Sequence, residues 1–226
     1  MKILRIITAL GGIIFAGLIG CKDQGKAVPT SPLVIANSLS VGLDTVFTFP
    51  QDTVVLTIRG GILPYSFIPP ATSAAQCTIV DSTLTIVAKS IGSNITGITD
   101  ASSPAHTASI PIIVGTSVSF TNSIQPIFVS SYGCSGTVGG CHGGTMGLYL
   151  TDAPTSYQNL VNVPAQSSGF VGYKRVAPRN LANSLLYIRL SSNDPAISMP
   201  RGRTAPFDST YLRNVRTWIL QGAHYN

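Results

Sequence analysis

The chain has no glutamate, a single tryptophan and few charged side chains. Eight aspartates supply all the acidic groups, and charged residues make up 10% of the 226 residues. Aliphatic residues are nonetheless plentiful and the net charge is modest, which excludes a disordered chain. After the first twenty residues no apolar run is long enough to cross a bilayer, so we expect the rest of the protein to be soluble.

The first twenty residues have the pattern of an export signal. Lys2 and Arg5 precede an apolar run from Ile6 to Leu18, which is too short and too rich in glycine to favour a membrane span. The run ends in Leu-Ile-Gly-Cys21, which resembles the lipobox of bacterial lipoproteins. That resemblance implies a signal peptide over residues 1–20 and a lipid on Cys21 that holds the chain to a membrane. An ordinary signal peptide and an uncleaved anchor remain alternatives.

The export signal also bears on location and partners. Lys22 follows Cys21 where some lipoproteins retained at the inner membrane carry aspartate, which favours the outer membrane within a cell-envelope location. The protein would face the periplasm or the cell surface. Export makes nucleic acid an implausible partner, although the formal net charge is +6.

The positive charge is concentrated in the C-terminal half. From Lys22 to Ser117 four cations stand against five aspartates, a net charge of −1. From Val118 to Asn226 eight cations stand against three aspartates, a net charge of +5. This half therefore favours an acidic partner or an anionic ligand.

The segment 33–116 has the pattern of an all-β unit, and the polar residues 21–32 before it form a tether. Short stretches of alternating apolar and polar residues are separated by glycine, proline and aspartate turns, which is typical of a sandwich. The expected strands are 46–49, 53–58, 65–68, 78–80, 83–87, 94–99 and 108–114.

The run from Arg59 to Phe67 contains Gly-Gly-Ile-Leu-Pro-Tyr and resembles bacterial immunoglobulin-like and PKD-like modules. The resemblance implies an Ig-like β-sandwich that acts as a spacer, with an adhesive or glycan-binding module as the alternative. Cys77 is expected to be a small buried apolar residue and His106 a solvated surface residue.

From residue 117 to residue 226 the pattern changes to short helices joined by glycine-rich loops. A helix with Ile124, Ile127 and Phe128 on one face is expected to start at Thr121 or Asn122. Further helices are expected at 156–161, at 184–190 and from Asp208 or Ser209 to Gly222.

One run in this half carries candidate chemistry. Cys134 and Cys141 lie seven positions apart across glycines, and His142 follows directly. The common haem attachment motif, Cys-x-x-Cys-His, is absent, and the spacing alone fits a Cys134–Cys141 disulfide equally well.

The whole order from Ser119 to Ala223 resembles the c-type cytochrome domains of bacterial surface and periplasmic proteins, including the planctomycete-type group. The segments that carry the resemblance are 119–128, Cys134 to Gly144, 147–150, 157–163, 175–178, 183–190, Met199-Pro200 and 218–223. It implies a mostly α, class-I-like cytochrome c domain over 117–226. It also implies haem c as cofactor, thioethers to Cys134 and Cys141, and His142 and Met199 as the proximal and distal ligands of the iron.

These roles predict an apolar shell around the haem and cations near its propionates. The shell is expected from Ile127, Phe128, Leu148, Leu150, Leu185, Leu186, Trp218 and Ile219, and the cations from Arg175, Arg201 or Arg203. His224 is expected at the surface, and it is the substitute iron ligand if Met199 does not bind the iron.

The sequence thus favours a membrane-anchored electron carrier with redox partner proteins and no catalytic residues. The alternative is a haem-free structural or adhesive lipoprotein closed by a Cys134–Cys141 disulfide. A haem enzyme or sensor would need an open axial position on the iron.

Overall fold

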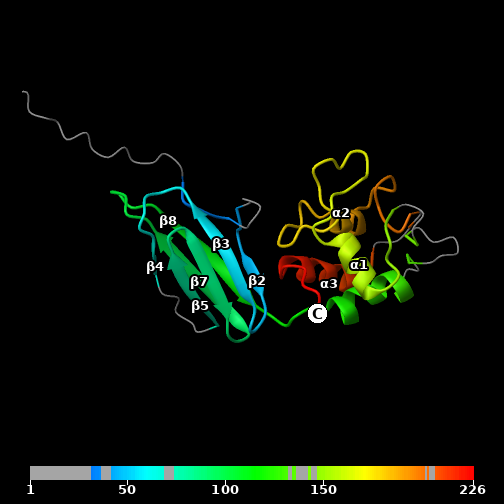
Figure 1. Ribbon diagram of the computed structural model, residues 1–226, viewed down its shortest axis with the longest axis horizontal. Coiled ribbons are helices and arrows are strands. Elements are labelled where there is room, and N and C mark those ends of the chain that lie inside the picture. The colour runs from blue at the N-terminus through cyan, green and yellow to red at the C-terminus, as the bar shows by residue number, and fades with distance from the viewer. Residues whose placement is uncertain are drawn as a thin grey trace, which may run out of the picture.

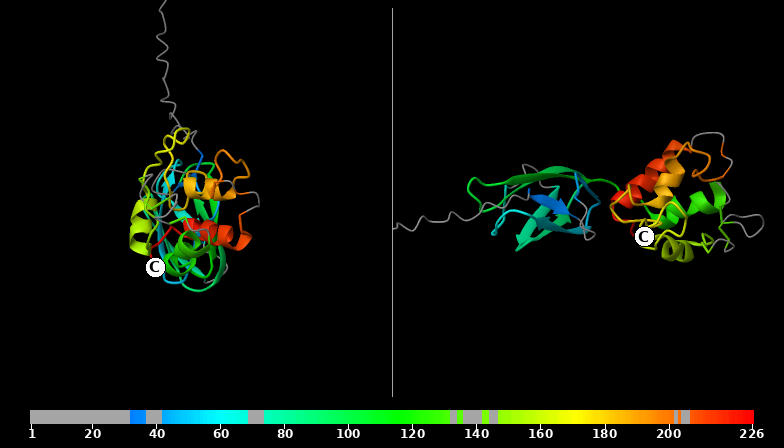
Figure 2. Two further views of the ribbon diagram at one scale, coloured as in Figure 1. Left: turned by 90° about the vertical axis from the view of Figure 1, so that its right-hand side faces the viewer. Right: turned by 90° about the horizontal axis from the view of Figure 1, so that it is seen from above.

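The computed structural model describes residues 32–36, 42–68, 74–131, 134–135, 142–143, 147–201, 203 and 207–226. Two separate hydrophobic cores are buried within it. The first is formed by residues from Leu33 to Val114 and the second by residues from Phe120 to Ala223. Figures 1 and 2 show a β-sandwich and a group of short helices side by side, joined by the segment that leaves β8. The expected signal peptide, the tether and the lipid site Cys21 lie outside the described residues.

The N-terminal part is a sandwich of two four-stranded sheets, in the orders β1-β3-β6-β5 and β2-β8-β7-β4. All neighbouring strands are antiparallel except β2 and β8, which are parallel. The strands are β1 (Val34–Ala36), β2 (Val46–Thr48), β3 (Thr53–Arg59), β4 (Ser66–Ile68), β5 (Ala75–Val80), β6 (Thr83–Ala88), β7 (Gly92–Thr99) and β8 (Thr107–Val114).

Alternation along the strands explains the sandwich core. In β3 every second residue, Val54, Leu56 and Ile58, is buried, and Leu84 and Ile86 of the neighbouring β6 are buried with them. Successive strand side chains point to opposite faces, so this pattern places one apolar face of each sheet inward.

The expected β-sandwich is confirmed, and all seven expected strands are present with ends shifted by up to three residues. The sequence pattern missed β1, whose three residues pair with β3. Cys77 is buried as expected, with its sulfur 3.3 Å from the Thr96 hydroxyl. The expectation for His106 is met in part: its side chain is 32% exposed, but its ring also bonds to Ser102 and Asp100.

The C-terminal part consists of short helices joined by long loops. Among the described residues, the α-helices α1 (Ala153–Leu160), α2 (Leu185–Ser191) and α3 (Ser209–Leu220) lie close to the expected positions. Before them come two short π-helical segments, η1 (Phe120–Ile124) and η2 (Ile127–Ser131). Asp208 caps α3 by accepting the N–H groups of Thr210 and Tyr211 at 2.8 and 3.2 Å.

The expected N-cap of this helix at Thr121 or Asn122 is wrong. The cap is Ser119, whose hydroxyl accepts the Asn122 N–H at 3.1 Å. The far end of the chain completes it, because the side-chain and main-chain oxygens of Asn226 accept the N–H groups of Phe120 and Thr121. A contact over more than 100 residues leaves no local signal in the sequence.

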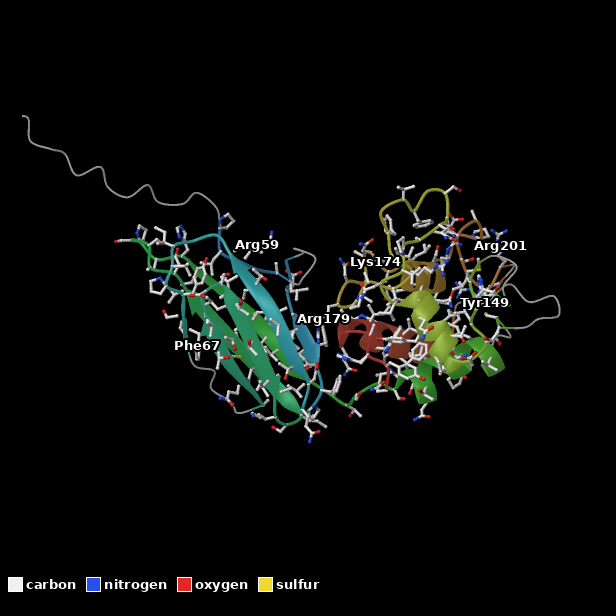
Figure 3. The ribbon with its side chains drawn as sticks, viewed as in Figure 1. Arg59, Phe67, Tyr149, Lys174, Arg179 and Arg201 are labelled. Atoms are coloured by element: carbon white, nitrogen blue, oxygen red, sulfur yellow. The ribbon has the colours of Figure 1, made fainter. Side chains whose placement is uncertain are left out.

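Arg179 joins the two parts of the molecule. Its guanidinium donates to the Phe47 carbonyl at 2.6 Å, to the Leu220 carbonyl at 3.2 Å and to the Asp52 carboxylate at 3.2 Å. Asp52 also accepts the Thr48 hydroxyl at 2.6 Å. Figure 3 shows Arg179 between the sandwich and the helices, so the contact between the two parts is specific and charged.

No helix within the described part of the chain is both long and apolar enough to cross a bilayer.

Candidate functional site

A cavity of about 550 Å³ lies in the helical part. Its wall is contributed by η2, the end of α1, the whole inward face of α2, and loops on either side of these helices. Cavities that bind small molecules and cofactors usually measure roughly 300–1,000 Å³. Arg201, on this wall, lies on the side of the helical part that is turned away from the sandwich (Figure 3).

Most of the wall is apolar. Six of the eight residues expected in a haem shell line it, and Trp218 and Ile219 are instead buried in the core behind it. The apolar lining residues are Ile127, Phe128, Leu148, Leu150, Leu160, Ala165, Leu185, Leu186, Leu190, Pro200 and Phe207.

His142 lies on this wall, and hydrogen bonds of its main chain fix its position. Its N–H donates to the Cys134 carbonyl at 3.1 Å, and its carbonyl accepts the Leu150 N–H at 3.0 Å. The Nδ1 atom of the ring is buried and has no hydrogen-bond partner among the described residues. Burial, and then the nearby charges of Arg189 and Arg175, lower the pKa of His142. The ring is therefore neutral at neutral pH, and a neutral imidazole has the lone pair that a metal ion binds.

Met199 reaches the same cavity from the loop that follows α2. Its N–H donates to the Arg189 carbonyl at 3.0 Å, which turns the loop back onto the helix. The thioether and the imidazole thus come from segments 57 positions apart in the sequence and meet at one cavity.

Cys134 also lines the cavity. Its carbonyl bond to His142 holds the two residues at one side of the wall. The other expected thioether position, Cys141, lies outside the described residues.

Three arginines bring positive charge to this wall: Arg175, Arg189 and Arg201. The donors of Arg175 go to neutral groups, the carbonyls of Asn159 and Gly147 at 2.9 and 3.1 Å. Burial lowers the pKa of Arg175, and burial followed by repulsion from Arg201 lowers that of Arg189. In the described part of the chain no carboxylate forms an ion pair with any of the three.

The sequence interpretation missed Arg189 and misplaced Arg203. Arg203, expected near the propionates, does not line the cavity and bonds to the carbonyls of Leu190 and Ser192. His224 is at the surface as expected, with its side chain 43% exposed and Nε2 3.7 Å from the Asp52 carboxylate. It does not line the cavity and so is not placed to substitute for Met199. Helical spacing was the available signal for Arg189, because positions 185, 186 and 189 share one face of a helix.

These residues fit a haem group. A haem needs an apolar enclosure, axial donors for its iron and a cationic environment for its two carboxylates, and this wall supplies all three. His142 and Met199 are the donors of the kind that ligate haem iron in electron-carrying cytochromes. Nowhere among the described residues, this wall included, are three His, Cys, Asp or Glu side chains grouped to hold a metal ion.

A scan against protein-family models finds no match to this chain, and a search of curated proteins finds no similar sequence.

Proposed function

We propose that the protein is a membrane-anchored c-type cytochrome that carries single electrons. Haem c would lie in the cavity described above, attached through Cys134 and Cys141 and held by His142 and Met199. The observation that carries the proposal is the meeting of a thiol, an imidazole and a thioether on one apolar wall with three arginines.

Each residue has a defined part in this function. Bound haem supplies an iron that takes up and releases one electron. His142 offers a neutral nitrogen and Met199 a soft sulfur, a pair that favours the reduced state and raises the reduction potential. With both His142 and Met199 holding the iron, no site for a substrate would remain on it, and the protein would act as a carrier and not as an enzyme.

The arginines support the same assignment. Arg175 and Arg189 are partly removed from water, which lowers the pKa of each, and neither pairs with a carboxylate among the described residues. The carboxylates of the haem would favour the charged forms of both. Their remaining charge would also favour the less positive, reduced state of the iron.

The rest of the chain would place this centre in the cell envelope. Lipid on Cys21 would hold the protein to a membrane, and Lys22 after it favours the outer membrane. The sandwich would act as a spacer that presents the cavity to redox partner proteins.

Haem staining of the denatured protein tests the proposal. The protein would be made in a host with a c-type maturation system, and Cys134→Ala and Cys141→Ala would be run beside it. We expect haem that stays with the denatured wild-type chain and a weaker or absent stain in both variants, because thioether bonds survive denaturation. Cys77→Ala is the matched control, since Cys77 is buried in the sandwich, and it should stain as the wild type does.

A wild type without stain would contradict the proposal. If mass spectrometry then found Cys134 and Cys141 joined in a disulfide, the second candidate would stand, a haem-free structural or adhesive lipoprotein. A stained protein that binds carbon monoxide or cyanide readily would instead point to a haem enzyme or sensor with an open axial position.

A further inference from the structure

The loop that carries Met199 folds back onto the last turn of α2. The N–H groups of Ile197 and Ser198 donate to the Asp194 carbonyl at 3.1 and 2.8 Å, which closes a tight turn. The N–H of Met199 then donates to the Arg189 carbonyl at 3.0 Å. The main chain of Arg189 therefore fixes the point at which Met199 lies against α2.

The side chain of Arg189 holds the same loop a second time. Its Nη1 donates to the Ile197 carbonyl at 3.2 Å, two residues before Met199. Its Nη2 donates to the Ser167 hydroxyl at 2.7 Å, and its guanidinium carbon lies 5.5 Å from the centre of the Phe170 ring. One residue thus ties α2, the loop that carries Met199 and the loop around Ser167 together.

We propose that Arg189 is the positioning residue for Met199, setting the place of the thioether on the cavity wall. Ligation of iron by Met199 rests on the proposed function, whereas the hold of Arg189 on the loop rests on the contacts alone. The hydrogen bonds to the Ile197 carbonyl and the Ser167 hydroxyl carry this assignment, independently of any anion that the charge of Arg189 also attracts.

The geometry requires arginine and not simply a positive charge. The planar guanidinium places two donors on two acceptors, the Ile197 carbonyl and the Ser167 hydroxyl, while its face lies over Phe170. A lysine ammonium is a compact charge that cannot make this set of contacts together. Arg189→Lys therefore keeps the charge and removes the hold on the loop, which separates positioning from electrostatics.

Arg203 is a matched control. It also donates to two main-chain carbonyls, those of Leu190 and Ser192 at 3.1 and 2.6 Å, and its guanidinium carbon lies 5.5 Å from the Phe207 ring centre. These hydrogen bonds hold the end of α2, and none of them goes to Ile197 or Met199. Arg203→Gln therefore removes a comparable set of contacts and leaves the hold on Met199 in place.

The experiment compares Arg189→Lys, Arg189→Gln and Arg203→Gln in the full-length, haem-stained protein. We expect both Arg189 variants to keep the stain but to lose the sulfur-to-iron charge-transfer absorbance of the oxidised form. The reduced forms should bind carbon monoxide about tenfold faster than the wild type, as expected when a hydrogen bond made by a charged group no longer holds the ligand. Arg203→Gln should match the wild type in both readouts.

Hydrogen exchange of the 195–200 segment provides a readout that does not depend on haem. The Met199 amide should exchange about tenfold faster in the Arg189 variants and at the wild-type rate in Arg203→Gln. Wild-type exchange and wild-type carbon monoxide binding in Arg189→Gln would overturn the inference, as would equal changes in Arg203→Gln. An unstained wild type would remove the proposed function and the ligand role of Met199, and the exchange result would still decide whether Arg189 holds the loop.

Discussion

Asp100 is a buried carboxylate that joins three pieces of loop in the sandwich. It accepts the N–H groups of Ile62 and His106 at 2.9 and 2.7 Å and the Ser102 hydroxyl at 2.6 Å. Burial alone would raise the pKa of Asp100, but the bonds from Ser102, His106 and Ile62 outweigh it and hold the pKa well below its ordinary value. Gly61 lies against this carboxylate at a φ of +65°, and a Cβ there would come within 2.5 Å of Oδ2.

The pKa of Asp100 predicts an acid-sensitive sandwich. A carboxylate whose pKa is lower in the folded than in the unfolded chain stabilises the fold above its unfolded pKa, and this contribution is lost as the pH falls below that value. We expect the urea midpoint of the wild type to fall between about pH 7 and about pH 3. Asp100→Asn should be less stable than the wild type at the higher pH and should show a smaller fall. Asp81→Asn, at an exposed turn, should keep the wild-type fall, and an unchanged fall in Asp100→Asn would contradict the assignment.

At the scale of single residues, the sequence indicated which side chains of the cavity could ligate a metal ion, but it did not indicate all of its arginines. His142 and Met199 stood out because each occupies a recognisable place in an ordered series of short motifs. Arg189 did not, because its importance comes from contacts with Ser167 and Ile197, which the fold brings to it from two loops.

Helix α3 shows how one side chain supports a whole element. Asp208 accepts two of the first N–H groups of the helix, which have no partner within it. The helix in turn buries Val215, Trp218 and Ile219 in the second core. The start of α3 therefore contributes to the stability of the helical part as a whole.

Replacing this cap should weaken the helical part by a modest amount. We expect Asp208→Ala to lower the free energy of unfolding by about 1 kcal/mol, the usual cost of removing such a cap. Asp208→Asn, which can still accept these bonds, should recover most of the loss. Urea titration followed by the fluorescence of Trp218 would measure both, and equal losses in the two variants would show that the charge of Asp208 matters and not its hydrogen bonds.

At the scale of elements, local patterns predicted most of the structure. Strands such as β3 and β8 followed from alternation, and α3 followed from its apolar spacing and its cap. The pattern could not reveal β1, which is three residues long and depends on β3 for its pairing. Nor could it fold the long loop between α1 and α2, whose order comes from bridges such as Val161 to Val176 and Lys174 to Ser184.

The junction between the two parts is a property of the whole molecule. The Asp52 side chain is 6% exposed and that of Arg179 13%, so their ion pair is largely removed from water. Gln221 adds a neutral tie, donating to the Thr116 carbonyl at 2.8 Å and accepting the Val118 N–H at 3.0 Å. The two cores are therefore held in one arrangement by polar contacts.

Removing the cation should loosen this arrangement. Arg179→Met would leave the buried Asp52 carboxylate with only the Thr48 hydroxyl and the nearby His224 ring, and we expect a loss of about 3–5 kcal/mol. Calorimetry should show the sandwich and the helical part melting further apart than in the wild type. Asp52→Asn in the same chain should restore part of the loss, and Arg213→Met, at an exposed position of α3, should have little effect. A single transition at the wild-type temperature in Arg179→Met would show that the pair does not couple the two parts.

The register of β1 sets where the chain enters the sandwich. Val34 pairs with Arg59, whereas Thr53, at the opposite end of β3, lines the small junction cavity with Pro178 and Arg179. The chain therefore enters the sandwich about 20 Å from the junction, given a rise of about 3.3 Å per residue. In physiological salt the Debye length is about 8 Å. Under the proposed lipid anchorage, the field of a charged lipid surface at that end would therefore decay before it reached Arg175 and Arg189. A partner approaching the cavity would then respond to the protein's own charges, and we expect the same salt dependence with and without the proposed lipid.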